Sequence, residues 1–338
     1  MKTATTARGY LTLAYGKGLY LQMAVNLARS LMVWDPAVPR AIICDTNARP
    51  LVEKYFDVII PTSERFGKRN LQKLGIYEYS PFEETLFIDA DCLVFRKPQR
   101  IWDRLSVDDF GVFGSLEKVG VWRYDFEHAC KAFDVDAMPK INGGCYYFRK
   151  CEKARRLFQD ANALTKQTDE IRKQLKQSFP VDTSLLGDEY HVSIAMAKNG
   201  FKPCDDRSER TMIGPIQLEV CNVRLNILKG VVRCWNSNIE YHPVLIHFFL
   251  KLNEGFHYRR EVWRLKKLVD EGRNSKVIGM QAYAYFNVYY FVFTCLYALA
   301  KIIMSKPTIK VMACVRPDYF FKGQKYKFLK LLARLGHR

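Results

Sequence analysis

The chain of 338 residues is long enough for one large α/β domain or for two domains, and its 49% hydrophobic and 26% charged residues are ordinary for a globular protein. Its net charge of +18 is unevenly distributed along the chain. Residues 301–338 hold ten Lys or Arg and one Asp, and so carry half of the net charge. This asymmetry predicts an anionic partner, either a membrane surface or a nucleic acid. The ten cysteines form no CxxC pair, which disfavours a zinc site, and residues 1–16 lack the pattern of a signal peptide. We therefore expect a cytoplasmic protein with mostly reduced thiols.

The first hundred residues alternate short apolar runs with segments of helical periodicity. We predict strands at 10–15, 40–45, 56–61 and 85–95 and helices at 20–34 and 70–82, the second helix being stopped by Ser80-Pro81. Strands that alternate with helices in this way form a mostly parallel, Rossmann-like sheet with both faces covered. No GxGxxG motif is present, so the dinucleotide-binding fingerprint is absent.

After residue 100 the pattern is mixed but still belongs to the α/β class. We predict strands at 109–115, 143–150 and 244–250, a long charged helix at 151–175, and a helix at 188–200 that ends at Gly200. The sequence contains no internal repeat.

An uncharged segment, 277–300, precedes the basic tail. It is long enough to span a bilayer as a helix, but Gln281, Asn287, Thr294 and five tyrosines suit the membrane–water interface better. With the basic tail it predicts an amphipathic helix that lies at the cytosolic face of a membrane. The alternative is a buried core helix of an oligomer.

The stretch TLFIDADCLVF, residues 85–95, places Asp89 and Asp91 inside an apolar run. Residues two apart on a strand point to the same side, so both carboxylates would project at the strand's carboxyl end, where ligands bind in open α/β sheets. Adjacent carboxylates repel each other, and Mg²⁺ or Mn²⁺ relieves this repulsion by taking oxygen ligands. The alternative is two exposed aspartates in a turn.

Further features occur in an order typical of one enzyme family. They are Lys73-Leu74, sixteen residues before Asp89, then Asn142-Gly143-Gly144, Asp188-Glu189, Trp235-Asn236, and His247 in LIHFF. With the Asp pair, and over residues 10 to about 250, the chain resembles GT-A-fold glycosyltransferases, specifically family 8, the glycogenin and bacterial lipopolysaccharide galactosyltransferase group. The resemblance implies a mostly parallel Rossmann-like sheet flanked by helices. The composition of 256–338 adds to it a C-terminal amphipathic helical and basic extension.

The resemblance implies a metal site and a catalytic carboxylate. Asp89, Asp91 and His247 would hold Mn²⁺ or Mg²⁺ against the diphosphate of a sugar nucleotide. Asp188 would lie near the anomeric carbon and stabilise positive charge there, or act transiently as a nucleophile in a retaining reaction. The alternatives are a packed core histidine and an aspartate that serves as a helix N-cap.

The resemblance also implies contacts to the donor. Lys73 would contact the sugar or the phosphates, and Asn142 and Gly144 would line the sugar pocket, where glycine permits a close approach of the ligand. Lys251 is a candidate for contact with the leaving diphosphate, although its spacing from His247 departs from the family pattern. The alternatives are a solvated helix lysine and a simple glycine turn. The family has Asn-Ser-Gly where this chain has Asn142-Gly143-Gly144, and Asp-Gln where it has Asp188-Glu189. These two departures leave the identity of the donor open.

Together these features predict a hexosyltransferase that uses a nucleotide-sugar donor, with uridine as the family's usual base, and a cell-surface glycan or lipid-linked acceptor. Residues 1–255 would form the catalytic domain, with a nucleotide-binding half to about residue 100 and an acceptor half over 101–255. Residues 256–338 would form a membrane-associating region. Under this interpretation nucleic acid is not a partner.

Two other functions are open to the sequence. A nucleic-acid-binding protein could stack bases on the alternating aromatic and basic residues of 318–328, but this interpretation leaves the ordered features unexplained. A phosphotransferase acting through Asp89 would need a phosphate-cradling glycine loop, which the sequence lacks.

Overall fold

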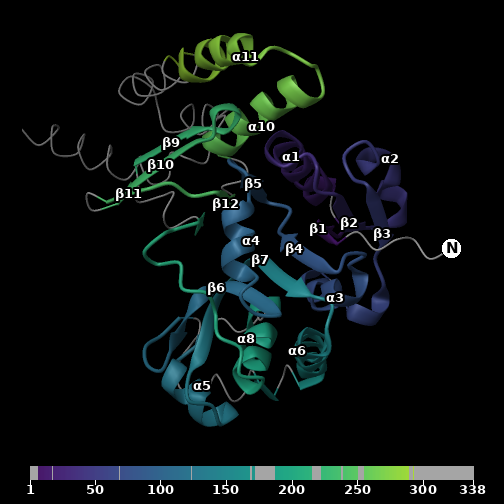
Figure 1. Ribbon diagram of the computed structural model, residues 1–338, viewed down its shortest axis with the longest axis vertical. Helices are drawn as coiled ribbons and strands as arrows, with labels where there is room; N and C mark the ends of the chain where they lie inside the picture. The colour runs from purple at the N-terminus through teal and green to yellow at the C-terminus, as the bar shows by residue number, and fades with distance from the viewer. Residues whose placement is uncertain are drawn as a thin grey trace, which may run out of the picture.

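The computed structural model describes residues 7–16, 18–67, 69–122, 124–167, 170–171, 187–214, 222–236, 239–249, 255–288 and 292. Its centre is a six-stranded mixed sheet in the order β3-β2-β1-β4-β7-β6 (Figure 1). The strands are β1 (Arg8–Ala14), β2 (Arg40–Cys44), β3 (Val58–Pro61), β4 (Glu84–Ile88), β6 (Phe110–Glu117) and β7 (Met138–Arg149). Within this sheet β7 runs antiparallel to both of its neighbours, and the other pairings are parallel.

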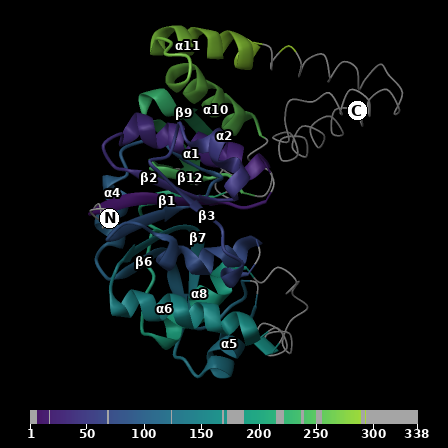
Figure 2. The same ribbon diagram turned by 90° about the vertical axis from the view of Figure 1, so that its right-hand side faces the viewer.

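Helices cover both faces of the sheet, so the molecule has three layers (Figure 2). On one face lie α1 (Gly18–Trp34), α4 (Gln99–Leu105) and α10 (Phe256–Val269), and on the other lie α6 (Glu152–Ala163) and α8 (Asp188–Lys198). The shorter helical segments are α2 (Arg49–Val52), α3 (Ile76–Tyr79), α5 (Phe126–Phe133), α11 (Ser275–Ala282), a π-helix (Tyr283–Val288), and the 3-10 turns Thr46–Ala48, Glu64–Phe66, η3 (Arg69–Gly75), Leu164–Gln167 and Ile227–Lys229.

Two smaller sheets flank the central one. Strands β9 (Asn222–Asn226), β10 (Val231–Asn236) and β11 (Ile239–Tyr241) form an antiparallel meander. Strand β12 (Leu245–His247) lies between β5 (Cys92–Val94), to which it is antiparallel, and β8 (Met212–Ile213), to which it is parallel. The β5–β12 pairing brings a segment near residue 247 beside the end of β4.

The sequence-based prediction of a helix-covered, mostly parallel α/β sheet is confirmed, and three elements differ from it. The run 85–95 is not one strand, because Asp89 N donates to Gly144 O and Cys92 N donates to Asp89 O, which makes a turn between β4 and β5. The helix expected at 70–82 is a 3-10 turn followed by the short helix α3. The helix expected at 151–175 ends at Ala163 as an α-helix.

The end of α8 agrees with its sequence. Gly200 has a φ of +72°, and Phe201 N donates to Met196 O, as in a glycine-terminated helix. Cys44, Cys92, Cys130, Cys145, Cys151 and Cys204 are free thiols.

The C-terminal helix α10 packs into the same hydrophobic cluster as α1. Tyr258 and Leu265 of α10 are buried together with Ala24 and Ala28 of α1. In the described segments, no helix has both the length and the apolar character to cross a membrane. The basic tail 301–338 lies outside the described residues, and the division of the chain at residue 255 stays a prediction.

Candidate active site

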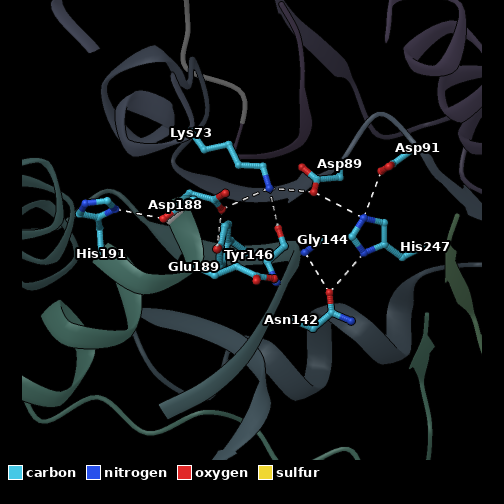
Figure 3. Close-up of polar contacts among 12 residues, drawn as sticks. Lys73, Asp89, Asp91, Asn142, Gly144, Tyr146, Asp188, Glu189, His191 and His247 are labelled. Carbon is cyan, nitrogen blue, oxygen red and sulfur yellow. Dashed lines mark hydrogen bonds and ion pairs between the residues drawn. The ribbon is translucent and has the colours of Figure 1, made fainter. Parts of the chain in front are cut away.

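Polar side chains from four parts of the chain meet where β4 ends, and Figure 3 shows them pointing toward one another. Lys73 comes from η3, Asp89 and Asp91 from the β4–β5 turn, Asp188 from the first residue of α8, and His247 from the end of β12. The middle of β7, Asn142 to Gly144, lies between these groups. The sequence-predicted carboxylates, lysine and histidine are therefore neighbours.

Asp89 and Asp91 approach the same histidine nitrogen. His247 Nε2 lies 3.1 Å from Asp91 Oδ1 and 3.6 Å from Asp89 Oδ2. The register of β5 and β12 pairs Cys92 with His247, and Phe248 N donates to Asp91 O over 2.9 Å. Backbone pairing, rather than a shared strand face, thus places the two carboxylates beside the ring.

The charges of this group depend on each other. Burial raises the pKa of Asp89 to about 6, against the opposing effect of the Lys73 charge. Burial also acts to raise the pKa of Asp91, but the charge and hydrogen bond of His247, together with the Lys73 charge, outweigh it and hold this pKa below its ordinary value. For His247 burial acts to lower the pKa, yet the Asp91 carboxylate outweighs burial and raises it. Without a metal, His247 and Asp91 therefore favour an imidazolium–carboxylate pair.

The donor set fits a hard divalent cation. Two cis ligands of an octahedral Mg²⁺ or Mn²⁺ at about 2.1 Å stand roughly 3 Å apart, which is close to the 3.1 Å between His247 Nε2 and Asp91 Oδ1. Asp89 Oδ2 is farther from this nitrogen, at 3.6 Å, and Asp89 is not among the residues whose ligand atoms all lie within 4.8 Å of one another. Asn142 Oδ1 lies 3.3 Å from His247 Nδ1, the other ring nitrogen, so it is placed to orient the ring. Asp91 and His247 are therefore placed to share such a cation, and Asp89 would join them as a third ligand if its carboxylate turned toward Asp91.

A cysteine also lies near this set. Cys92 Sγ, Asp91 and His247 have ligand atoms within 4.8 Å of one another. However, burial raises the pKa of the Cys92 thiol well above its ordinary value, and the thiol lies 3.7 Å from Gly144 O as a donor. Carboxylate oxygens suit Mg²⁺ and Mn²⁺ better than a thiol sulfur does, so we favour Asp89 over Cys92 as the third ligand.

Lys73 is a buried cation between two carboxylates. Its Nζ donates to Asp89 Oδ2 over 2.7 Å, to Asp188 Oδ2 over 3.2 Å and to Gly143 O over 3.1 Å. Burial acts to lower the pKa of Lys73, but the charges of Asp188 and Asp89 outweigh it and raise the pKa above its ordinary value. Lys73 is therefore a permanent positive charge within the site and not a solvated helix lysine.

The two glycines of β7 are required by close contacts. A Cβ on Gly144 would lie 2.5 Å from His247 Nδ1 and 2.5 Å from Met212 Cε, and one on Gly143 would lie 2.8 Å from Glu189 Cγ. Gly143 N donates to Glu189 Oε1 over 2.8 Å. Gly144 therefore makes room for the histidine, a role that the expected pocket-lining position did not include.

The structure describes no contact between the remaining sequence-predicted residues and this group. Lys251 lies outside the described residues. Trp235 and Asn236 end β10, in the separate β9–β10–β11 sheet. Tyr146, whose hydroxyl donates to Asp188 Oδ2 over 3.0 Å, was missed, because an aromatic residue in a strand normally indicates only a core position.

Comparisons with known proteins give structural resemblances only. No family model matches the sequence, and no curated protein is significantly similar to it. A galactosyltransferase, LgtC, solved with donor and acceptor sugar analogs, is 15% identical over 70% of this chain and 86% of that chain, with a TM-score of 0.41. The glycosyltransferase GlyE of Streptococcus pneumoniae TIGR4 is 11% identical over 80% of this chain and 62% of that chain, with a TM-score of 0.47. Mouse xyloside xylosyltransferase 1 is 10% identical over 73% of this chain and 99% of that chain, with a TM-score of 0.43.

The solved structures that this chain resembles are thus glycosyltransferases at low sequence identity. At these TM-scores the likeness establishes neither activity nor substrate.

Proposed function

We propose that the chain is a metal-dependent glycosyltransferase that moves a hexose from a nucleotide sugar to an acceptor. The observation that carries the proposal is the meeting of Asp89 and Asp91, whose carboxylates both lie within 3.6 Å of His247 Nε2, with the Lys73–Asp188 pair. A cation and a lysine beside each other suit a diphosphate, and a carboxylate next to them suits developing positive charge on a sugar.

Each group has a role that its surroundings support. Asp89, Asp91 and His247 would hold Mn²⁺ or Mg²⁺, which when bound neutralises charge on the leaving diphosphate. Lys73 would attract a phosphate of the donor through its fixed positive charge, from its position between Asp89 and Asp188. Asp188, with a side chain only 6% exposed, would stabilise positive charge at the anomeric carbon, consistent with a retaining reaction.

The donor and acceptor follow from the same resemblance that the sequence shows. We propose a UDP-sugar as donor, and a cell-surface glycan or a lipid-linked molecule as acceptor. Asn142 and Gly144 would lie beside the sugar, and Lys251 beside the leaving diphosphate. No described contact reads the nucleotide base, so the base and the sugar are to be found by experiment.

We also propose that the protein works at the cytosolic face of an anionic membrane. One face of α11 buries Ile278 and Ala282, and its outward face exposes Val277 and Met280 by 46% and 75%; Tyr283, the first residue of the π-helix that follows, is 64% exposed. Apolar side chains that project from a helix next to a basic segment favour the interfacial region of a bilayer. A lipid-linked acceptor would be held at the same surface.

A thermal-shift panel of sugar nucleotides with Mn²⁺ tests the activity. At least one nucleotide should raise the melting temperature only with Mn²⁺ present, because the cation links the diphosphate to Asp89, Asp91 and His247. The stabilising donor is then assayed for metal-dependent hydrolysis and for transfer to glycan acceptors. A panel in which no nucleotide stabilises the protein would contradict the proposal.

A further inference from the structure

Tyr146 is a fully buried strand residue whose hydroxyl reaches the candidate catalytic carboxylate. Its Oη donates to Asp188 Oδ2 over 3.0 Å (Figure 3). Its ring stacks on Phe87, with centroids 6.1 Å apart, and contacts Phe110 at 5.8 Å. A phenylalanine would fill the same space between these rings, so packing alone does not require the hydroxyl.

Lys73 does not hold the Asp188 carboxylate by itself. Its ammonium has three protons and three acceptors, and it lies closer to Asp89, at 2.7 Å, than to Asp188, at 3.2 Å. One weak contact leaves a carboxylate free to rotate about its χ2 torsion. A second donor on the same oxygen removes this freedom, and Tyr146 supplies it.

The backbone is adapted to this hydrogen bond. A Cβ on Gly143 would lie 2.8 Å from Tyr146 Oη and 3.1 Å from Asp188 Oδ2, so only glycine lets the phenol and the carboxylate meet. Burial raises the pKa of Tyr146 well above its ordinary value, which keeps the phenol a donor. In the described part of the chain both donors to Asp188 act on Oδ2, and Oδ1 receives none.

We propose that Tyr146 is a positioning residue for Asp188. With Lys73 it fixes the carboxylate through Oδ2 and leaves Oδ1 for the sugar of the donor. The inference rests on the proposed glycosyltransferase function and adds to it a residue that acts through Asp188 and does not touch the substrate.

The test compares Tyr146→Phe with Tyr147→Phe, two hydroxyl deletions in adjacent buried residues of β7. Tyr147 Oη donates to Glu84 over 3.0 Å, and its ring meets Trp102 on the other face of the sheet. Tyr146→Phe should lower kcat by roughly tenfold to a hundredfold, the effect of one hydrogen bond to a charged group, and should change the donor KM by less than about twofold. Tyr147→Phe should leave both constants unchanged.

A rescue experiment separates positioning from folding. p-Aminophenylalanine in place of Tyr146 restores a para donor, and it should return kcat toward the wild-type value. Circular dichroism and melting temperatures of all variants establish that they are folded. If Tyr146→Phe does not fold, the protein with p-aminophenylalanine at position 146 tests the inference instead. A kcat of that protein below about a tenth of the wild-type value would contradict the positioning role.

Other outcomes are equally decisive. Three outcomes would overturn only the role of Tyr146: an unchanged kcat in Tyr146→Phe, an equal fall of kcat in Tyr147→Phe, or a change in the donor KM of Tyr146→Phe without a fall in kcat. The proposed function would stand in each case, since the wild-type protein would still be a glycosyltransferase. A wild-type protein that turns over no sugar nucleotide would instead overturn the proposed function and the Tyr146 role together.

Discussion

Asp91 offers the sharpest test of the metal site at the scale of single residues, because its main partner is His247. Asp91→Asn keeps the shape of the side chain and removes its charge. We expect it to abolish Mn²⁺-dependent stabilisation by the donor and to lower activity by about a hundredfold or more, since a metal ligand is lost. Melting temperatures with and without Mn²⁺ and nucleotide, together with rates, give the readout.

The matched control is Asp136→Asn, which removes the same charge from an exposed position outside the site. It should behave as the wild type does. Metal-dependent stabilisation that survives in Asp91→Asn would rule out Asp91 as a ligand.

Gly144 gives a second prediction, about packing. Gly144→Ala places a Cβ 2.5 Å from the His247 ring and from Met212, so either the ring moves or the strand shifts. We expect a loss of about 1–3 kcal/mol in unfolding free energy, and weaker Mn²⁺ binding, because the displaced atom neighbours the proposed ligand. Chemical denaturation and Mn²⁺ titration measure the two effects.

Gly279→Ala is the control for this substitution. Gly279 lies inside α11, and a Cβ added there would meet no other atom within 4 Å, so alanine should raise helix stability by about 0.4–1 kcal/mol. Equal destabilisation by both alanines would contradict the packing argument for Gly144.

The sequence could predict which residues gather but not how they touch. Asp89, Asp91 and His247 were identified by type, spacing and order, whereas a turn and the β5–β12 pairing actually place them. Contacts between segments more than a hundred residues apart, such as Asn142 with His247, leave no periodic signal. Tyr146 was missed for the same reason, since its hydroxyl distinguishes it from a core phenylalanine only in three dimensions.

At the scale of elements, the strongly periodic segments were predicted well. Strands β1, β2 and β3 and helix α1 agree with their apolar patterns to within a few residues. The prediction for the run 85–95 was wrong because an apolar pattern continues through two strands of different sheets, and only the turn at Asp89–Asp91 separates them. The 3-10 geometry at η3 likewise follows from tertiary contacts and not from helix propensity.

Helix α10 is tied to α1 by a polar cluster that makes a further prediction. Arg29 donates to both oxygens of Asp270, over 3.1 and 2.6 Å, and Tyr55 Oη donates to Asp270 Oδ1 over 3.0 Å. Burial acts to raise the pKa of Asp270, but the hydrogen bond from Arg29 and its charge outweigh burial and lower the pKa. Asp270→Asn should therefore lower the unfolding free energy at neutral pH by about 2 kcal/mol.

The pH dependence of this effect has a definite sign. A carboxyl whose pKa is depressed on folding contributes stability above its unfolded pKa, about 3.9, and this contribution disappears as the pH falls through the folded-state value. The difference in unfolding free energy between the wild type and Asp270→Asn should thus disappear at acid pH, as measured by urea unfolding across a range of pH. Glu271→Gln, on an exposed neighbour, should show a much smaller gap. A gap that stays constant with pH would contradict the role of the charge.

At the scale of the whole molecule, charge and apolar surface are concentrated toward the C-terminus. Half of the net charge of +18 lies in residues 301–338, and α11 with the following π-helix exposes apolar side chains just before that tail. Trp263 of α10 meets Phe286 at 5.7 Å between ring centroids, and Ile278 and Ala282 are buried, so the exposed face of α11 has a defined orientation. We propose that the basic segment and the oriented apolar face would act together on an anionic bilayer, because electrostatic attraction would bring the protein to the surface and burial of side chains would retain it there.

This arrangement predicts that α11 contributes to membrane binding through Met280 and Tyr283. The double variant Met280→Glu, Tyr283→Glu keeps the buried Ile278–Ala282 face but places two carboxylates where lipid would be, so its binding to anionic vesicles should fall about tenfold or more. Flotation with phosphatidylserine-containing and neutral vesicles measures this. Val107→Glu, at an equally exposed apolar residue between α4 and β6, should bind as the wild type does. Unchanged flotation of the double variant would show that the exposed face of α11 does not enter the membrane.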